Sequence, residues 1–212
     1  MNKIITKTYA WMFVGLLVSF ITGYYVSTNA NMLYNIFATN MYWILAIVEI
    51  AVVIILSARL NKMSSMTAKT LFILYSFLTG LTLSVIFVAY RLDSIVFVFG
   101  ITSLMFLIMS LIGRFTKLNL TKLSTFLLMG IIAILIASII NVFIGSETFD
   151  LGITIISIII FVIYIAYDTQ KIKYIAESVE EERASILCAL ELYLDFINLF
   201  LDLIKLFGKS RD

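Results

Sequence analysis

Seven long apolar stretches follow one another along the 212 residues of this chain, and they constrain its fold more than any other feature. A helix needs about 20 mostly apolar residues to cross a hydrocarbon layer about 30 Å thick, because it rises about 1.5 Å per residue. The stretches cover residues 9–26, 41–60, 70–90, 95–113, 124–144, 151–174 and 184–208. We therefore predict an all-α membrane protein, a bundle of seven transmembrane helices forming a single transmembrane domain over residues 1–212.

Composition supports this class and limits the chemistry. Hydrophobic residues make up 62% of the chain and charged residues 13%, with a net charge of +2, whereas soluble domains are nearer half apolar and a quarter charged. The basic residues are scattered between apolar stretches, so we expect no nucleic-acid partner. The chain has no histidine, which is the usual sensor of near-neutral pH and the commonest transition-metal ligand. We expect no cofactor, and a monomer surrounded by the lipid bilayer.

The connections between the stretches predict the orientation. We predict a loop over the uncharged residues 27–40 and another of about ten residues between the last two stretches. Basic residues favour the cytoplasmic side of a membrane. Grouping the N-terminus with the second, fourth and sixth loops places 11 of the 15 basic residues on one side. We therefore expect a cytoplasmic N-terminus and, since no organelle-targeting signal is visible, a bacterial inner (plasma) membrane.

The last apolar stretch carries charge where hydrocarbon tolerates it least. Asp195 lies eleven residues after Ala184, so its carboxylate is roughly 16 Å into the layer. A charge that faces lipid costs from about 2.5 to more than 10 kcal/mol. We therefore expect the last helix in the centre of the bundle. The polar residues on the same side of this helix as Asp195 are Glu191, Asn198, Asp202 and Lys205.

Asp168 lies about 9 Å from the end of the sixth stretch, at a depth similar to that of Asp195. If the two carboxylates meet, full charges about 4 Å apart repel by about 4 kcal/mol at an effective dielectric near 20. A shared proton that leaves at roughly pH 6 to 7 would then make the pair a pH sensor. Ionised, its oxygens suit a transient Ca²⁺. The alternative is that both aspartates form fixed ion pairs, with Arg59 or Lys205, which only hold the helices in register.

Three further features carry hypotheses. Glu49 lies at mid-depth in the second stretch, and we expect salt bridges of Glu49 with Lys205 and of Arg59 with Asp168. The acidic run 177–183, ESVEEER, suits a solvated loop or the first turn of the last helix, with an ion-attracting mouth as the alternative. In the third stretch Ser76, Gly80 and Ser84 form a face of small residues that predicts close helix packing.

Two segments carry a resemblance to a known family. They are FVIYIAYDTQKI at 161–172 and ALELYLDFINLFLDLIKLFG at 189–208, and FLTGLTLS at 77–84 extends the similarity to the third stretch. The chain resembles the transmembrane Bax inhibitor motif family, in particular its bacterial calcium-leak members.

This resemblance implies a seven-helix fold around the last helix and a pH-sensitive calcium leak across the membrane. It also implies a hydrogen-bonded pair of Asp168 and Asp195 whose protonation sets the open and closed states, with Arg59 near Asp168. Glu49 is expected to pair with Lys205, a lysine in place of arginine that gives up the bidentate fork.

Other function classes fit the residues less well. An intramembrane aspartyl protease needs Gly-x-Gly-Asp before its second aspartate, whereas this chain has no glycine at Tyr193 or Leu194, so we expect no enzyme. A retinal protein needs a buried lysine in its last span, and Lys205 is near the membrane boundary. The alternatives that stay open are a proton-coupled transporter and a structural or regulatory membrane protein without ion flux.

Overall fold

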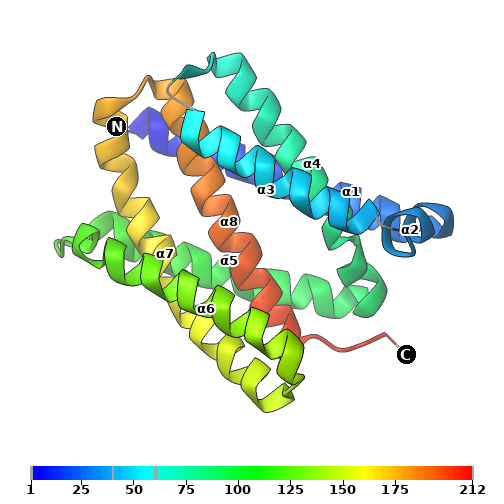
Figure 1. The fold of residues 1–212 in the computed structure, drawn as a ribbon. Helices are drawn as coiled ribbons and strands as arrows, with labels where there is room; N and C mark the ends of the chain where they lie inside the picture. Colours follow the sequence, from blue (N-terminus) through cyan, green and yellow to red (C-terminus); the bar gives the residue numbers. More distant parts are fainter. Residues whose placement is uncertain (1, 40, 60–61, 212) are drawn as a thin grey trace. The chain divides into compact units, whose positions relative to one another are not determined.

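The computed structural model describes residues 2–39, 41–59 and 62–211, and these residues are almost entirely helical (Figure 1). Seven of the described helices are long and apolar enough to cross a membrane. They are α1 (Asn2–Ser27), α3 (Met41–Arg59), α4 (Ser65–Ala89), α5 (Leu92–Phe115), α6 (Ser124–Ile144), α7 (Glu147–Ser178) and α8 (Glu181–Phe207). The predicted all-α fold with seven spans is therefore confirmed.

The segment between the first two spans differs from the prediction. Within residues 27–40, predicted as a loop, the structure has the short helix α2 (Ala30–Phe37). The side chain of Asn29 caps this helix by accepting a hydrogen bond from the backbone N–H of Met32 at 3.2 Å, and such a cap satisfies a donor that the first turn leaves open. A short 3₁₀ helix, η2 (Leu120–Leu123), precedes α6. The predicted end of the second span, at residue 60, lies outside the described residues.

The connection between the last two spans is also shorter than predicted. Helix α7 continues to Ser178 and α8 begins at Glu181, so two residues replace the expected loop of about ten. No glycine or proline interrupts this segment, and its lysines, alanine and glutamates are good helix formers. Glu181 and Glu182 occupy the first turn of α8, where negative charge suits the helix dipole. The first-turn reading of the acidic run is thus confirmed for these two residues.

The chain divides into two compact units. The first comprises Met1–Leu92, Ile175–Tyr193 and Ser210–Asp212, and the second Asp93–Tyr174 and Leu194–Lys209. Helix α8 contributes to both, and 67% of its most apolar window is buried, more than in any other span. This burial supports the predicted central position of the last helix. The single domain over residues 1–212 stays a prediction.

Small residues allow close helix contacts within the first unit. A Cβ added at Gly80 of α4 would lie 2.6 Å from the Cβ of Thr22 and 2.8 Å from the carbonyl oxygen of Ser19, both on α1. Ser76 and Ser84, one turn on either side of Gly80, are fully buried. The small-residue face of the third apolar stretch therefore packs against a neighbouring helix, as predicted.

The second unit holds its helices together by a similar contact and by aromatic rings. A Cβ at Gly113 of α5 would lie 2.1 Å from the carbonyl oxygen of Ala166 on α7. Phe196 of α8 packs against Phe99 and Phe106 of α5, with ring centroids 5.2 and 5.7 Å apart. Helix α5 thus contacts the segments that carry Asp168 and Asp195.

The contact at Gly113 gives a prediction with an internal control. Gly113→Ala places a methyl group against backbone that cannot move aside, so we expect a loss of about 1–3 kcal/mol in unfolding free energy and a lower thermal midpoint in detergent. Gly100 lies on the same helix with nothing within 4 Å of an added Cβ. Gly100→Ala should leave the midpoint unchanged or raise it, because alanine favours helix over glycine. Equal midpoints for both variants would contradict this packing.

Candidate functional site

Asp168 is held in the interior of the second unit by its neighbours on α7. Its exposed fraction is 5%, and those of Thr169 and Gln170 are 5% and 6%. The Gln170 side chain donates to the carbonyl oxygen of Leu118 and accepts from the N–H of Leu120, both at 2.8 Å. These bonds fix the rotation of α7 and keep Asp168 away from the outer surface of the helix.

Asp195 of α8 is equally enclosed, with an exposed fraction of 5%. The adjacent Phe196 is anchored against α5 by the ring contacts described above, so this part of α8 has a fixed face. Both aspartates belong to the second unit. Neither aspartate is turned toward lipid. Their direct pairing stays a prediction.

Lys171 is the basic group that sequence reasoning did not place near Asp168. Its Nζ lies 3.9 Å from Oδ1 of Asp168, one turn along α7. Spacing of three residues in a helix brings two side chains to the same face, and this signal was available in the sequence. Arg59, the expected partner of Asp168, is an exposed residue at the end of α3 in the first unit. The Arg59–Asp168 salt bridge stays a prediction.

Three of the polar residues predicted on this side of α8, namely Glu191, Asn198 and Asp202, are half-buried. The Asn198 side chain donates to the carbonyl oxygen of Leu194 on its own helix at 2.8 Å. Asp202 accepts from the hydroxyl of Ser157 on α7 at 2.5 Å. Glu191 is half-buried in the first unit. None of the three carries its polar group on an exposed surface, as the cost of facing lipid requires.

The structure supplies partners for Glu49 and Lys205 that the sequence did not predict. Oε1 of Glu49 accepts from the hydroxyl of Thr79 at 2.5 Å, and Oε2 accepts from Thr82 at 3.3 Å, both on α4. Lys205 forms a short ion pair with Asp150 at the start of α7. The predicted Glu49–Lys205 salt bridge joins residues of different units and stays a prediction.

The acidic start of α8 is neutralised by lysines within the first unit. Lys7 of α1 pairs with Glu181, at 2.6 Å, and also with Glu182. Lys69 of α4 pairs with Glu182 at 2.6 Å and lies 5.7 Å from the ring centroid of Trp11. This pairing supports a structural role for Glu181 and Glu182, and the ion-attracting mouth considered as an alternative stays a prediction. They tie the beginnings of three helices together.

A dedicated metal centre is not visible in the described part of the chain. Among those residues, no group of three or more His, Cys, Asp or Glu side chains is arranged to hold a metal ion. A transient Ca²⁺ contact at Asp168 and Asp195 would involve only these two carboxylates. It stays a prediction.

Seven apolar helices, with two aspartates buried in the last two, define a multi-pass α-helical membrane protein whose interior carries ionisable groups. The chain belongs to the family described as "Inhibitor of apoptosis-promoting Bax1", which matches residues 1–212. This result confirms the resemblance at the level of the family.

Individual bacterial relatives are similar over most of their length. The inner membrane protein YbhL of Escherichia coli strain K12 is 42% identical, over 97% of this chain and 91% of the relative. A protein of Borreliella burgdorferi is 41% identical, over 100% of this chain and 94% of the relative. A membrane protein of Streptococcus pyogenes serotype M1 is 36% identical, over 80% of this chain and 75% of the relative.

The lysine–glutamate cluster gives a second prediction. Glu182→Gln removes the carboxylate shared by Lys7 and Lys69, so it should lower the thermal midpoint at low salt, by an amount corresponding to at most about 1 kcal/mol for part-exposed pairs. The difference from wild type should shrink at about 1 M salt, because screening then acts within about 3 Å. Glu147→Gln is the matched control, since Glu147 is an exposed first-turn glutamate of α7. A deficit for Glu182→Gln that is independent of salt would contradict an ionic role.

Proposed function

We propose that this protein is a pH-sensitive calcium leak channel, gated by protonation of a buried pair formed by Asp168 and Asp195. The observation that carries the proposal is the 5% exposure of each aspartate on consecutive membrane-spanning helices. Intramembrane carboxylates are costly, so their presence favours a role in ion or proton movement. The family resemblance of the two segments that contain them supports the same role.

The absence of histidine concentrates the pH response on carboxylates. The chain has 13 acidic residues and no imidazole, so a response near neutral pH requires carboxyl groups in an unusual environment. Two nearby aspartates inside a membrane resist simultaneous ionisation, because their charges repel in a poorly screened interior. The pair then keeps one proton in acidic conditions and loses it as pH rises.

The sign of gating follows from this chemistry. With a proton present, one carboxyl donates a hydrogen bond to the other and holds α7 and α8 together. When that proton leaves, the two charges repel, and their oxygens attract a divalent cation of the kind that oxygen ligands bind. Calcium flux should therefore be small in acid and larger in alkaline solution. Lys171 at 3.9 Å from Asp168 stabilises the ionised state on that side of the pair.

A flux assay tests the proposal directly. Liposomes that contain the purified protein and a calcium dye should fill with Ca²⁺ several-fold faster at pH 8 than at pH 6. Asp168→Asn and Asp195→Asn should each flatten this dependence, since neither variant retains a pair that shares a titratable proton. Glu147→Gln, which removes an exposed carboxylate from the same helix as Asp168, should retain it.

Two outcomes would overturn the channel. One is the absence of calcium entry into wild-type liposomes at both pH values. The other is calcium entry accompanied by stoichiometric proton efflux, measured with an internal pH dye, which would indicate a proton-coupled transporter. Asp168→Glu and Asp195→Glu keep an ionisable carboxyl and should retain a pH-dependent flux with a shifted midpoint, which separates gating from misfolding.

We further propose a bacterial inner-membrane location with the N-terminus in the cytoplasm. The name of the E. coli relative and the 11 basic residues predicted for the N-terminal side support it. In a Cys188→Ala background, an impermeant maleimide applied to spheroplasts should label Glu147→Cys, at the first residue of α7. It should leave Lys117→Cys, which follows α5, unlabelled until the membrane is opened. The reverse labelling would invert the topology.

A further inference from the structure

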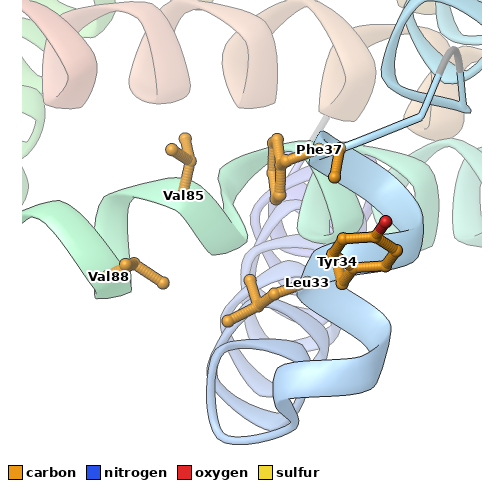
Figure 2. Close-up of a pocket in the computed structure, with 6 residues that line it drawn as sticks. Leu33, Tyr34, Phe37, Val85 and Val88 are labelled. Atoms are coloured by element: carbon orange, nitrogen blue, oxygen red, sulfur yellow. The ribbon is translucent and has the colours of Figure 1, made fainter.

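An open apolar pocket lies between α2 and the end of α4, within the first unit. Its volume is about 420 Å³, within the range of small-molecule sites. Figure 2 shows the side chains of α2 and α4 that surround it. The lining residues are Leu33, Tyr34, Phe37, Ala38, Val85 and Val88.

The position of the pocket along the spans is that of a membrane–water boundary. Helix α2 connects the end of α1 to the start of α3, and Val88 is one residue from the end of α4. The exposed aromatic residues at these same helix ends are Tyr24 (46%), Tyr25 (60%), Tyr34 (67%) and Trp43 (68%). Tyrosine and tryptophan gather at the level of the lipid headgroups. The pocket therefore opens just inside that level.

Helix α2 has the pattern of a helix that lies in this boundary. Ile36 is buried, Leu33 and Phe37 are half-buried, and Asn31 and Asn35 are exposed. A short helix between two spans that has one apolar and one polar side suits the plane of the membrane interface better than the hydrocarbon interior of the membrane. Its apolar side and α4 then form the two walls of the pocket.

The chemistry of the walls selects the occupant. Every lining side chain is hydrocarbon except for the hydroxyl of Tyr34, and residues 8–48 of the chain contain no charged side chain. The residues that line the pocket therefore include no cation that could bind a lipid phosphate. Their mostly apolar surface lies at the depth where the acyl chains of lipids begin, so it suits an acyl chain. We propose that this pocket binds one acyl chain of a bilayer phospholipid, in the leaflet at the end of α1, and that it recognises the hydrocarbon and not the headgroup.

Fluorescence quenching by brominated lipid tests the assignment. In a Trp11→Phe, Trp43→Phe background, Tyr34→Trp places the only indole in the pocket. Met32→Trp places the indole on the same helix, at a residue that does not line the pocket. The native Met32 is 38% exposed. In vesicles of phosphatidylcholine with increasing fractions of chain-brominated phosphatidylcholine, Tyr34→Trp should reach half-maximal quenching at a several-fold lower mole fraction than Met32→Trp.

Two further arms separate the occupants. Val88→Phe fills the pocket and should move the Tyr34→Trp curve onto that of Met32→Trp. Brominated phosphatidylglycerol should give the same Tyr34→Trp curve as brominated phosphatidylcholine. Coincident curves for the two reporters without Val88→Phe would mean ordinary contact with surrounding lipid and would overturn the site. A several-fold preference for the anionic lipid would overturn recognition by hydrocarbon, and lack of quenching in Tyr34→Trp would exclude a lipid occupant.

Discussion

The energetic cost of polar groups in hydrocarbon is the constraint on which this structure depends. A lipid-facing carboxylate is destabilising by several kcal/mol, so helices α7 and α8 must be rotated to place their aspartates inward. Asp168 and Asp195 are each 5% exposed, while Leu151, Ile155 and Ile159 are among the apolar residues exposed on α7. The rotation of each helix is fixed by specific contacts, namely the Gln170 hydrogen bonds in α7 and the Phe196 ring contacts in α8.

Short hydroxyl side chains satisfy several of the polar groups away from the helix ends. Thr79 and Thr82 donate to Glu49, Ser157 donates to Asp202, and Ser19 shares a hydrogen bond of 2.6 Å with the fully buried Tyr193. A neutral hydroxyl brings little desolvation cost of its own, unlike a second buried charge. It also serves as donor or acceptor, so these sites accommodate either protonation state of a carboxyl group.

Three lysines form ion pairs near the ends of spans, in contrast to Lys171, which lies beside the buried Asp168. Lys7 and Lys69 meet Glu182 where α8 begins, and Lys205 meets Asp150 where α7 begins. Water and salt screen charges at such positions, so each pair contributes modestly. Their arrangement nevertheless fixes which helix ends lie together. Glu49 and Asp202 thus accept hydrogen bonds from hydroxyl groups, whereas Lys7, Lys69 and Lys205 form ion pairs near the helix ends.

The sequence by itself determined the seven spans, because long uncharged runs leave a backbone in lipid no alternative to helix. It also indicated that Asp168 and Asp195 lie inside, since the cost of exposing them is independent of fold details. It did not predict α2 or the two-residue turn before α8, where a single cap or a few good helix formers decide between helix and loop. Only the tertiary structure decided which side chains meet: Thr79 and Thr82 at Glu49, and Asp150 at Lys205. Those pairings depend on the rotation and depth of separate helices. Packing contacts set both, such as the contact of Gly80 of α4 with α1 and that of Gly113 of α5 with α7. A local pattern can mark the small residue, but it does not name the helix that packs against it.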